Sequence, residues 1–493
     1  EIVIPPRVSM SGIKSQAGVT FEKITITSDE NMGAIYKFSA EVLYVDFDTM
    51  MTFTNWRNMD IKKVEVSASN VFYTSKDGIL YHDFTLKRRE TSCPNCGSYS
   101  CNIKEYKVRK IKHSAYNQRN CVLLYHARRF VCKDCGRTFY EPNPFVATEH
   151  SISKLTIINV LNELKEYNST FSSAAKHNNI SSTQAEAIFD DYVNIPRQTL
   201  PRVICIDEIY SKTSRKNKYS CLLLDFETSN LIDVIINRRK TTLLNYFEKI
   251  PKSERENVEY VSMDLYETYR SVVKLRLPKA KVCADPFHVI KNYNEALDKV
   301  RKRVMNKFPK KSVEYYLLKK FNWTLFKDEV RENESKWNKK LHRYINYPQI
   351  LDLILGISDE LRTAYYLKSD YVYFNKHSNL ENAENDLWKH IEEMKKSNIQ
   401  EILKLKKTLI NWSQEIINSF TFIDGRRITN GIMESKNGIA KEIKNNAKGY
   451  KNFLRYRNRC LYCMNKTTKP NYAGSHKSIR MKGWPRGRYK KNK

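Results

Sequence analysis

The chain has 493 residues, of which 41% are hydrophobic and 12% aromatic, and it carries a formal net charge of +32 at pH 7. Such a length provides about three domains of roughly 100 to 200 residues with ample cores, which excludes a disordered tail, a collagen and a disulfide-stapled mini-protein. No segment approaches the roughly 18 consecutive apolar residues of a membrane helix, and no secretory signal opens the chain. We therefore expect a soluble, intracellular protein.

The excess of positive charge indicates a polyanionic partner, and nucleic acid fits best. A Lys-rich genome is the alternative for part of this excess. The basic residues are clustered, however: nine lie in residues 299–320 against one acid, Glu314, and eight lie in residues 477–493 with no acid. The second cluster also contains Trp484 and Tyr489, a mixture suited to phosphate contacts and base stacking. A solvated, flexible tail is the alternative there.

Two Cys-x-x-Cys-Gly motifs, CPNCG and CKDCG, are separated by residues 97–131. Each motif turns the chain so that both thiolates face one point, and together they supply the four sulfurs that structural zinc prefers. The Phe-Val before the second motif and the Thr-Phe-Tyr after it predict the flanking strands of a zinc ribbon. A pair of disulfides is the alternative, disfavoured in an intracellular chain with seven further cysteines. The expected zinc ligands are Cys93, Cys96, Cys132 and Cys135.

The next segment reads as helices with a short break. The small pair Ala174 and Ala175 precedes a turn at residues 178–179, and Ser181 or Ser182 caps the helix that follows. This layout predicts a helix-turn-helix motif, with plain helix packing as the alternative. The residues that its second helix would offer to a DNA groove are Ser182, Thr183 and Gln184.

After Pro201 the hydrophobic pattern changes to short, strand-like runs. Three such runs are followed by a helical pattern, a fourth strand, a second helical pattern and a fifth strand. This order is expected of a ribonuclease-H-like layer. In chain order, the segments are 202–210, 218–226, 231–239, 241–250, 258–264, 265–274 and 280–285.

Acidic residues on this layer predict the chemistry. Asp207 lies inside the first apolar strand, where burying an unpaired carboxylate costs several kcal/mol. Asp264 ends the fourth strand, which neighbours the first in such a layer, and Glu434 lies on a later helix expected to cross the sheet. Three converging carboxylates can hold two magnesium ions roughly 3.5 to 4 Å apart. The alternatives are a Lys partner for Asp207, a helix cap for Asp264 and a surface position for Glu434.

From about residue 80 to 467 the chain resembles bacterial insertion-sequence transposases of the ISL-three family, within the DDE superfamily. The motifs that carry the resemblance are the two cysteine motifs, the helix-turn-helix, IDEIY, SMDLYETYR, ADPFHVIKNYNEALDKVR and TNGIMESKNGIAKEIKNNAKGYKNFLRYRNRCLY. The resemblance implies that Asp207, Asp264 and Glu434 are the metal-binding catalytic triad. It also implies that Asp285 and His288 support the site, with a core position as the alternative for His288.

The expected fold is α/β and multidomain, with an N-terminal zinc ribbon and helix-turn-helix and a ribonuclease-H-like catalytic core interrupted by a helical insertion. The insertion would clamp DNA and build a dimer, or act as a passive spacer, and Arg301, Lys302 and Arg303 are its expected DNA contacts. The first residues resemble nothing in the family, and Met59 is a candidate natural start. The expected domains are a leader of unknown origin at 1–75, a zinc ribbon at 76–145, a helix-turn-helix at 146–198, the first part of the core at 199–290, the helical insertion at 291–420, the last helices of the core, carrying the final acid, at 421–467, and a basic tail at 468–493.

The function implied is that of a transposase that binds the terminal inverted repeats of an insertion sequence and catalyses metal-dependent strand cleavage and strand transfer. Two magnesium or manganese ions and one structural zinc are the expected cofactors. The expected partners are terminal-repeat and target DNA and a second copy of the chain, with no membrane, in the bacterial cytoplasm at the nucleoid. The alternatives are a catalytically inactive or repurposed zinc and helix-turn-helix DNA-binding protein, and a structure-selective nuclease of the same fold.

Overall fold

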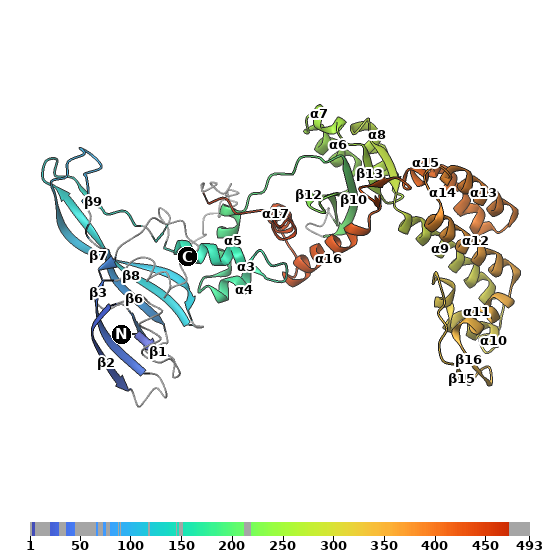
Figure 1. Cartoon of the computed structure of the whole chain (residues 1–493), viewed down its shortest axis with the longest axis horizontal. Helices are drawn as coiled ribbons and strands as arrows, with labels where there is room; N and C mark the ends of the chain where they lie inside the picture. Colours follow the sequence, from blue (N-terminus) through green and yellow to red (C-terminus); the bar gives the residue numbers. More distant parts are fainter. Residues whose placement is uncertain are drawn as a thin grey trace, which may run out of the picture. The chain divides into compact units, whose positions relative to one another are not determined.

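The computed structural model describes residues 79–86, 88, 90–116, 119–143, 145–146, 151–211 and 218–472, and the strands at 2–4, 20–28, 36–44, 66–67 and 72–74. The chain divides into two units, Glu1–Asn194 with Thr467–Lys493, and Ile195–Lys466 (Figure 1). We call them unit 1 and unit 2. Met59 and the tail beyond residue 472 lie outside the described residues. No described helix is long and apolar enough to span a membrane.

Unit 1 contains a sheet of order β1-β3-β2 and a larger one of order β4-β6-β8-β7, in which β5 also pairs with β6 and β9 with β8. The first sheet falls within the segment expected to be a leader. The strands are β1 (Ile2–Ile4), β2 (Thr20–Ser28), β3 (Tyr36–Tyr44), β4 (Val66–Ser67), β5 (Phe72–Thr74), β6 (Leu80–Leu86), β7 (Cys101–Tyr116), β8 (Arg119–Cys132) and β9 (Thr138–Tyr140).

Strands β7 and β8 form one long antiparallel hairpin, which the sequence analysis did not anticipate. Its open end pairs Cys101 with Cys132, so the hairpin returns the chain to its starting point and brings the two cysteine motifs together. The strand predicted after the second motif is present as β9, which pairs with β8. Strand β7 pairs with β8 at one side only, so it is an edge strand of this sheet, apart from an isolated bridge between Lys112 and Ile152.

Three helices complete the described part of unit 1: α3 (Lys154–Glu163), α4 (Phe171–His177) and α5 (Ser182–Tyr192). Ala174 and Ala175 are buried, so α4 and α5 pack closely. The turn between them contains Asn179 in the left-handed region, with φ of 56°. Ser181, one of the two residues predicted as the N-cap, caps α5 and forms a capping box with Gln184.

Unit 2 is built on a five-stranded sheet of order β12-β11-β10-β13-β14. Strands β10, β11 and β12 are antiparallel neighbours, whereas β10, β13 and β14 run parallel. The predicted order of strands and helices is present, with α7 as an additional short helix. The elements are β10 (Val203–Tyr210), β11 (Tyr219–Asp225), β12 (Leu231–Ile235), α6 (Lys240–Glu248), α7 (Lys252–Glu256), β13 (Tyr260–Met263), α8 (Glu267–Arg276) and β14 (Lys281–Ala284).

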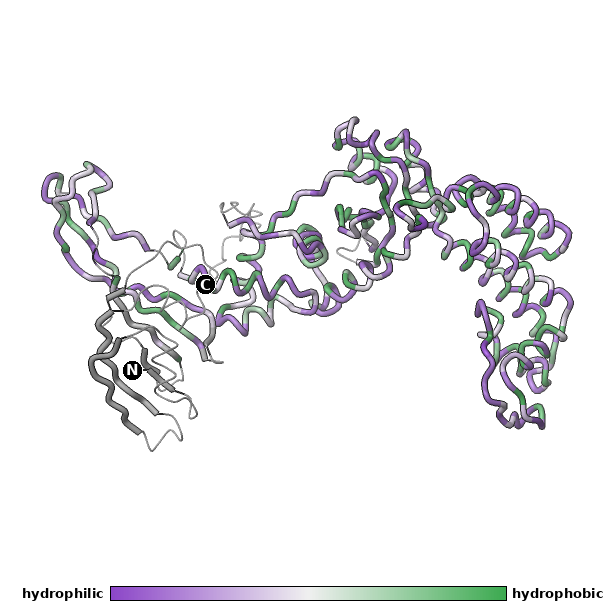
Figure 2. The backbone as a smooth tube through the Cα atoms, viewed as in Figure 1, coloured by the Kyte–Doolittle hydropathy of each residue, from purple (hydrophilic) through white to green (hydrophobic). Residues whose placement is uncertain are grey.

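The long helix α9 (Pro286–Met305) leads from the sheet into a helical segment with its own core (Figure 1). Its helices alternate hydrophobic and hydrophilic positions (Figure 2), as the predicted helical periodicity requires. The helices agree with the expected helical insertion, whereas a hairpin of two short strands within it was not predicted. The elements are α10 (Val313–Lys320), η3 (Asn322–Leu325), β15 (Lys336–Asn338), β16 (Arg343–Ile345), α11 (Tyr347–Gly356), α12 (Asp359–His377), α13 (Ala383–Lys396), α14 (Gln400–Asn411) and α15 (Ser413–Asn418).

The chain then returns to the sheet. A small hairpin of β17 (Phe422–Ile423) and β18 (Arg426–Arg427) precedes α16 (Gly431–Asn446) and α17 (Phe453–Met464). Helix α16 packs on β10 and α17 packs on β12. Asn465 exchanges two 2.8 Å hydrogen bonds with the backbone of Leu231, so edge strand β12 is covered at that point. The chain is thus an α/β multidomain protein.

Candidate functional site

The two cysteine motifs of unit 1 form matching turns. In each, the glycine N–H donates to the carbonyl of the first cysteine, Gly97 to Cys93 at 2.9 Å and Gly136 to Cys132 at 3.0 Å. Both glycines have positive φ, 74° and 68°, which side-chain-bearing residues adopt at a cost. The glycine that follows each cysteine pair therefore allows the tight turn that points both thiols to one side.

The four thiols converge as the spacing predicted. Cys93 Sγ lies 3.6 Å from Cys135 Sγ, and Cys96 Sγ lies 3.6 Å from Cys132 Sγ. Thiolates about 2.3 Å from a zinc ion form a tetrahedron with edges of about 3.8 Å, so this donor set fits structural zinc. Backbone N–H groups of the second turn lower the pKa of Cys132 and Cys135, which favours the thiolate form that binds metal. All four are free thiols, which excludes the disulfide alternative for this structure.

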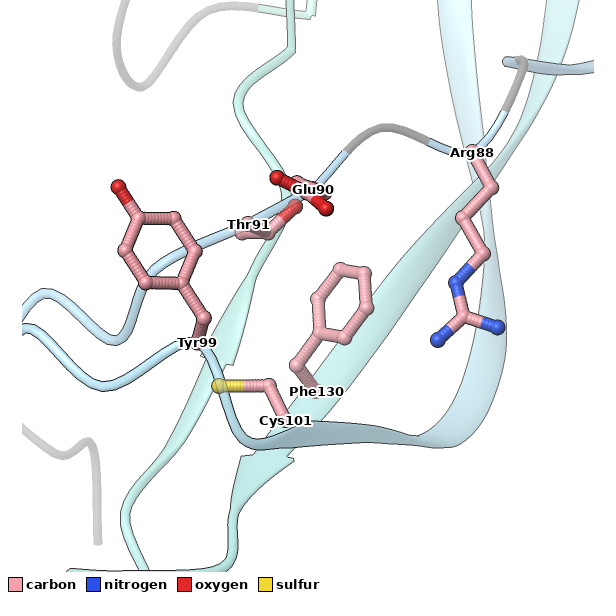
Figure 3. A pocket seen from close by; sticks show the side chains of 6 residues that line it. All are labelled: Arg88, Glu90, Thr91, Tyr99, Cys101 and Phe130. Atoms are coloured by element: carbon pink, nitrogen blue, oxygen red, sulfur yellow. The ribbon is translucent and has the colours of Figure 1, made fainter.

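An open recess of about 550 Å³ lies beside the first cysteine motif (Figure 3). It has an aromatic ring, Phe130, and a thiol, Cys101, at its base, and Tyr99 stands at its rim with 72% of its surface exposed. Its remaining lining residues are Arg88, Glu90 and Thr91. The recess lacks converging acids or a nucleophile beside a base, so it is not a candidate catalytic centre.

In unit 2 three aspartates occupy the same register position on three neighbouring parallel strands. The last paired residues are Ile206 with Met263 and Met263 with Ala284. The next residue on each strand is an aspartate. In-register residues of parallel strands lie side by side, so Asp207, within β10, forms a row with Asp264 and Asp285, which directly follow β13 and β14. We call these three residues the acid row.

The acid row is partly buried, and the negative charges of its neighbouring carboxylates repel one another. Burial raises the pKa of Asp207 to about 6, and the negative charge of Asp264 adds to this effect. Burial also raises the pKa of Asp285 to about 6, against a lowering by the backbone N–H of Asn430. Carboxylates placed together at such cost are typical of functional sites.

His288 joins the row from the first turn of α9. Its Nε2 lies 2.9 Å from Asp264 Oδ1. Burial lowers the pKa of His288, but the hydrogen bond and charge of Asp264 outweigh it, so the pKa is raised overall. The ligand atoms of Asp264, Asp285 and His288 all lie within 4.8 Å of one another. Asp264 therefore has a histidine partner and does not cap α8, whose N-cap is Tyr266.

Two asparagines attach α16 to this end of the sheet. Asn430 Nδ2 donates to the carbonyl of Ile206 at 3.1 Å, and its backbone N–H donates to Asp285 Oδ1 at 3.3 Å. Asn437 Nδ2 donates to Asp207 Oδ2 at 2.5 Å. Glu434 lies between them, four residues after one and three before the other, so all three share one face of the helix. Its side chain is exposed in the first turn of α16.

The donor set fits a divalent cation that prefers oxygen. The ligand atoms that converge are those of Asp264, Asp285 and His288, with Asp207 on the neighbouring strand and Glu434 on the helix α16 outside this group. The amide oxygens Oδ1 of Asn430 and Asn437 are buried and accept no hydrogen bond from the described residues. Buried oxygens without donors beside carboxylates are what a Mg²⁺ or Mn²⁺ ion or its bound water would satisfy.

The residues expected to contact DNA differ in their exposure and in the partners that their side chains have. Ser182 and Thr183 are exposed at the start of α5, whereas the side chain of Gln184 is used in the capping box. Arg301 is only 5% exposed and donates to Asp298 at 2.6 Å and to the carbonyl of Leu318 at 2.8 Å.

Two neighbouring basic residues also have protein partners. Arg303 pairs with Glu360 at 2.6 Å and Glu401 at 2.9 Å, and Lys302, although exposed, pairs with Asp298 at 2.7 Å. The guanidinium groups of Arg301 and Arg303 thus hold helices of unit 2 together, and DNA contacts by Arg301, Lys302 and Arg303 stay a prediction.

A row of cations on β7 was not predicted from the sequence. Its exposed basic residues form no ion pair within the described residues, and its one acid, Glu105, pairs with Arg129 on β8 at 2.8 Å. The dense KVRKIK run between the cysteine motifs was the available signal. The members of this row are Lys104, Lys107, Arg109, Lys110 and Lys112.

Stability should depend on pH through Asp207. Its pKa rises from 3.8 to about 6 on folding, so the group imposes no penalty below about pH 4 and destabilises the fold increasingly as pH rises through 6. Without added divalent cation, we expect Asp207→Asn to raise the free energy of unfolding of unit 2 by about 2 to 3 kcal/mol at pH 7 and by little at pH 4. Urea unfolding of both proteins across this range measures the difference, and a difference independent of pH would contradict the burial of a charged Asp207.

Comparison with known proteins adds independent information. Residues 204–460 match the family model of the ISL3 transposases, the family called ISL-three above, and residues 89–135 match that of the zinc finger of transposases IS204/IS1001/IS1096/IS1165. Over 121 residues the chain is 33% identical to the transposases for insertion sequence element IS1557 of two Mycobacterium tuberculosis strains, CDC 1551 / Oshkosh and ATCC 25618 / H37Rv. That match covers 24% of this chain and 26% of each relative, about a quarter of their length. Because the first match spans more than half of the chain and includes the acid row and Glu434, the chain belongs to the ISL3 family of DDE transposases.

Proposed function

We propose that this chain is a DNA transposase in which unit 2 cuts and joins DNA strands and unit 1 binds the terminal inverted repeats of its insertion sequence. The observation that carries the proposal is the acid row, three carboxylates in register at the carboxyl ends of parallel strands. Asp207, Asp264 and Glu434 are the proposed catalytic triad, with Asp285 and His288 in support. The printed names of the relatives, transposases for an insertion sequence element, agree with this proposal.

The sheet supports a ribonuclease-H-like assignment for this core. Three antiparallel strands, β12, β11 and β10, continue into two parallel strands, β13 and β14, reached through helices. The order places the first and fourth strands side by side, which puts Asp207 next to Asp264. The helical segment leaves the core after β14 and returns before α16, so an insertion separates Glu434 from the other two acids in sequence.

The chemistry follows from the carboxylates and their supports. A divalent cation bound there would activate the attacking oxygen and stabilise the leaving one. Asn437 holds one oxygen of Asp207, and His288 lies against Asp264, so both carboxylates are kept in place before DNA arrives. Cleavage would add water to a terminal phosphate and release a 3′ hydroxyl. That hydroxyl would attack a target phosphate and displace the target 3′ oxygen, with no covalent intermediate on the protein.

The surface of unit 1 supports DNA binding. The unpaired cations on β7 present a row of positive charge along an exposed edge strand, which suits the phosphates of a duplex. Ser182 and Thr183 are exposed at the N-terminus of α5, the helix that would serve as the recognition helix of a helix-turn-helix. Repeat recognition would therefore combine phosphate contacts from β7 with base contacts from α5, and a dimer would pair the two ends.

The test is cleavage of a labelled duplex that carries the element's own terminal repeat, with Mg²⁺ and with EDTA added just before the reaction. We expect nicking at the repeat boundary in Mg²⁺ only, and none on a duplex of shuffled sequence. Binding without cleavage in Mg²⁺ or Mn²⁺ would favour the inactive or repurposed DNA-binding protein. Cleavage of branched DNA without repeat specificity would favour a structure-selective nuclease.

Asn437 should set the metal requirement of this reaction. Removing its amide with Asn437→Ala frees one oxygen of Asp207 from its hydrogen bond, so the carboxylate loses its fixed orientation. Groups that orient metal-binding residues typically contribute 10-fold to 100-fold in metal affinity. We expect the Mg²⁺ concentration for half-maximal cleavage to rise by about this factor, whereas Asn446→Ala, at the exposed end of the same helix, should leave it unchanged. An unchanged Mg²⁺ dependence in Asn437→Ala would contradict the positioning role.

A further inference from the structure

The hairpin of β15 and β16 carries an exposed aromatic pair. Trp337 and Tyr344 are direct cross-strand partners, with ring centroids 5.3 Å apart and planes inclined by 63°. Their exposed fractions are 52% and 69%, so neither ring is used in the core of the helical segment. Two large aromatic side chains held together in solvent offer an exposed ring surface on which a flat partner can stack.

The hairpin beneath this pair is well anchored. Asn338 is 8% exposed, and its Oδ1 accepts hydrogen bonds from the backbone N–H groups of Lys340 at 3.0 Å and Leu341 at 3.2 Å. Ile345 is 3% exposed and belongs to the core of the helical segment. The turn also contains His342 with φ of 50°. The opposite side of the hairpin is thus bound to the protein, which holds the two aromatic rings outward.

Cations lie beside the pair along the hairpin: Lys336 and Arg343 are its neighbours on β15 and β16, where successive side chains alternate between the two faces, and Lys339 lies in the turn. Lys336, Lys339 and Arg343 are exposed and form no ion pair within the described part of the chain. Lys340 Nζ donates to the carbonyl of Lys311 at 2.7 Å, so the hairpin lies beside the second half of the basic run in residues 299–320. Two exposed acids, Glu332 and Glu334, precede β15, and none lies within β15, β16 or their turn.

We propose that Trp337 and Tyr344, with Lys336, Lys339 and Arg343, form a stacking platform for unpaired bases of a DNA strand. Aromatic rings beside cations bind single strands because the rings stack on base faces while the cations neutralise phosphates. In a duplex the base faces are covered by neighbouring bases, so the aromatic pair adds little there. Among its described side chains the β7 row has many cations and a single exposed ring, Tyr106, so it suits the phosphates of a duplex instead.

The platform rests on the proposed function and gives the helical segment a task within it. It belongs to the same unit as the acid row. Helix α9, whose N-cap is Asp285, leads from the sheet into the helical segment, and β15 and β16 lie at the end of that segment away from the sheet (Figure 1). Cutting and joining DNA ends produces strand ends whose terminal bases are open to stacking. A platform for unpaired bases in this unit would retain such an end after cleavage.

The experiment compares the full-length protein with Trp337→Ala, using fluorescence anisotropy of a labelled 20-nucleotide single strand and of a duplex of the same length. Trp388→Ala is the matched control, because Trp388 is also exposed, at 42%, in the same helical segment but on α13 among acidic residues. Calcium replaces magnesium so that cleavage does not interfere. A Trp337→Phe variant tests whether an aromatic face is sufficient, and circular dichroism confirms that each variant is folded.

We expect Trp337→Ala to weaken single-strand binding about tenfold and duplex binding less than twofold. Trp337→Phe should retain most of the single-strand affinity, and Trp388→Ala should change neither. Equal losses on both DNAs, or no loss on either, would overturn the platform while leaving the transposase proposal intact. Failure of the wild-type protein to bind any DNA would overturn both.

Discussion

Asp207→Asn is expected to reduce cleavage of a terminal-repeat duplex about a thousandfold or more while DNA affinity changes less than twofold. The amide keeps the size of the side chain, and its single oxygen can still accept the hydrogen bond from Asn437, although the one that Asp207 Oδ1 accepts from the backbone N–H of Glu208 is lost. The fold should be retained. The substitution removes the negative charge of Asp207, which lies next to Asp264 in the acid row. Loss of one member of a catalytic unit commonly removes most of the rate enhancement. Binding should persist because the cations of β7 belong to unit 1.

The measurement is single-turnover cleavage in saturating protein, which separates the chemical step from binding. Glu259→Gln is the matched control, because Glu259 is an exposed acid beside the amino end of β13, at the other end of the sheet from Asp264. It should cleave at the wild-type rate. Cleavage by Asp207→Asn within a few-fold of wild type would refute the assignment of the acid row. Loss of both cleavage and binding in this variant would instead indicate a structural role for Asp207.

Cys132→Ser is expected to abolish stoichiometric zinc binding, disorder the motif end of the β7–β8 hairpin and weaken DNA binding by at least tenfold. Structural zinc contributes about 10 to 16 kcal/mol to small zinc-binding folds, far more than the packing of two short turns can replace. Cys132 ends β8 and pairs with Cys101, so the loss should spread into the hairpin that carries the cations. The thermal transition of unit 2 should stay where it is, because the four thiols belong to unit 1.

Released zinc, measured with a chromogenic chelator after thiol modification, should fall from about one ion per chain to less than about a tenth. Cys101→Ser is the control. Cys101 is also a thiol of the hairpin and donates to the carbonyl of Ser98 at 3.5 Å, but it is not one of the four converging sulfurs. It should retain zinc and bind DNA normally. Full zinc content in Cys132→Ser would show that the ligand set is wrong.

Local features of the sequence predicted the parts that depend on short-range geometry. The spacing and glycines of the cysteine motifs determine how two thiols face one point, so the zinc ligands followed from a few residues each. Ser181 could be recognised as a helix cap for the same reason. Asp207 could be recognised because burying an acidic side chain inside an apolar strand costs free energy in any fold.

Other features depend on partners far away in the chain and could not be derived from local sequence. Arg301 lies in a strongly basic run, yet its guanidinium is buried against Asp298 and Leu318, which is a property of helix packing and not of charge density. Asn437 reads as an ordinary polar residue until α16 places its amide 2.5 Å from a carboxylate 230 residues earlier. The β7–β8 hairpin was hidden because charged residues on an exposed edge strand lack the apolar alternation that marks a half-buried strand.

The sequence by itself thus determined the zinc ligands, the chain order of the core strands and the candidate catalytic acids. Each of these depends on the local spacing of residues or on the free-energy cost of burying one charge. Only the tertiary structure decided that Asp207, Asp264 and Asp285 share one register position, that two asparagines attach the helix of Glu434 beside them, and that Trp337 and Tyr344 face solvent together. Each of these follows from strand pairing and helix packing, in which the free energy of a contact depends on residues that sequence alone does not bring together.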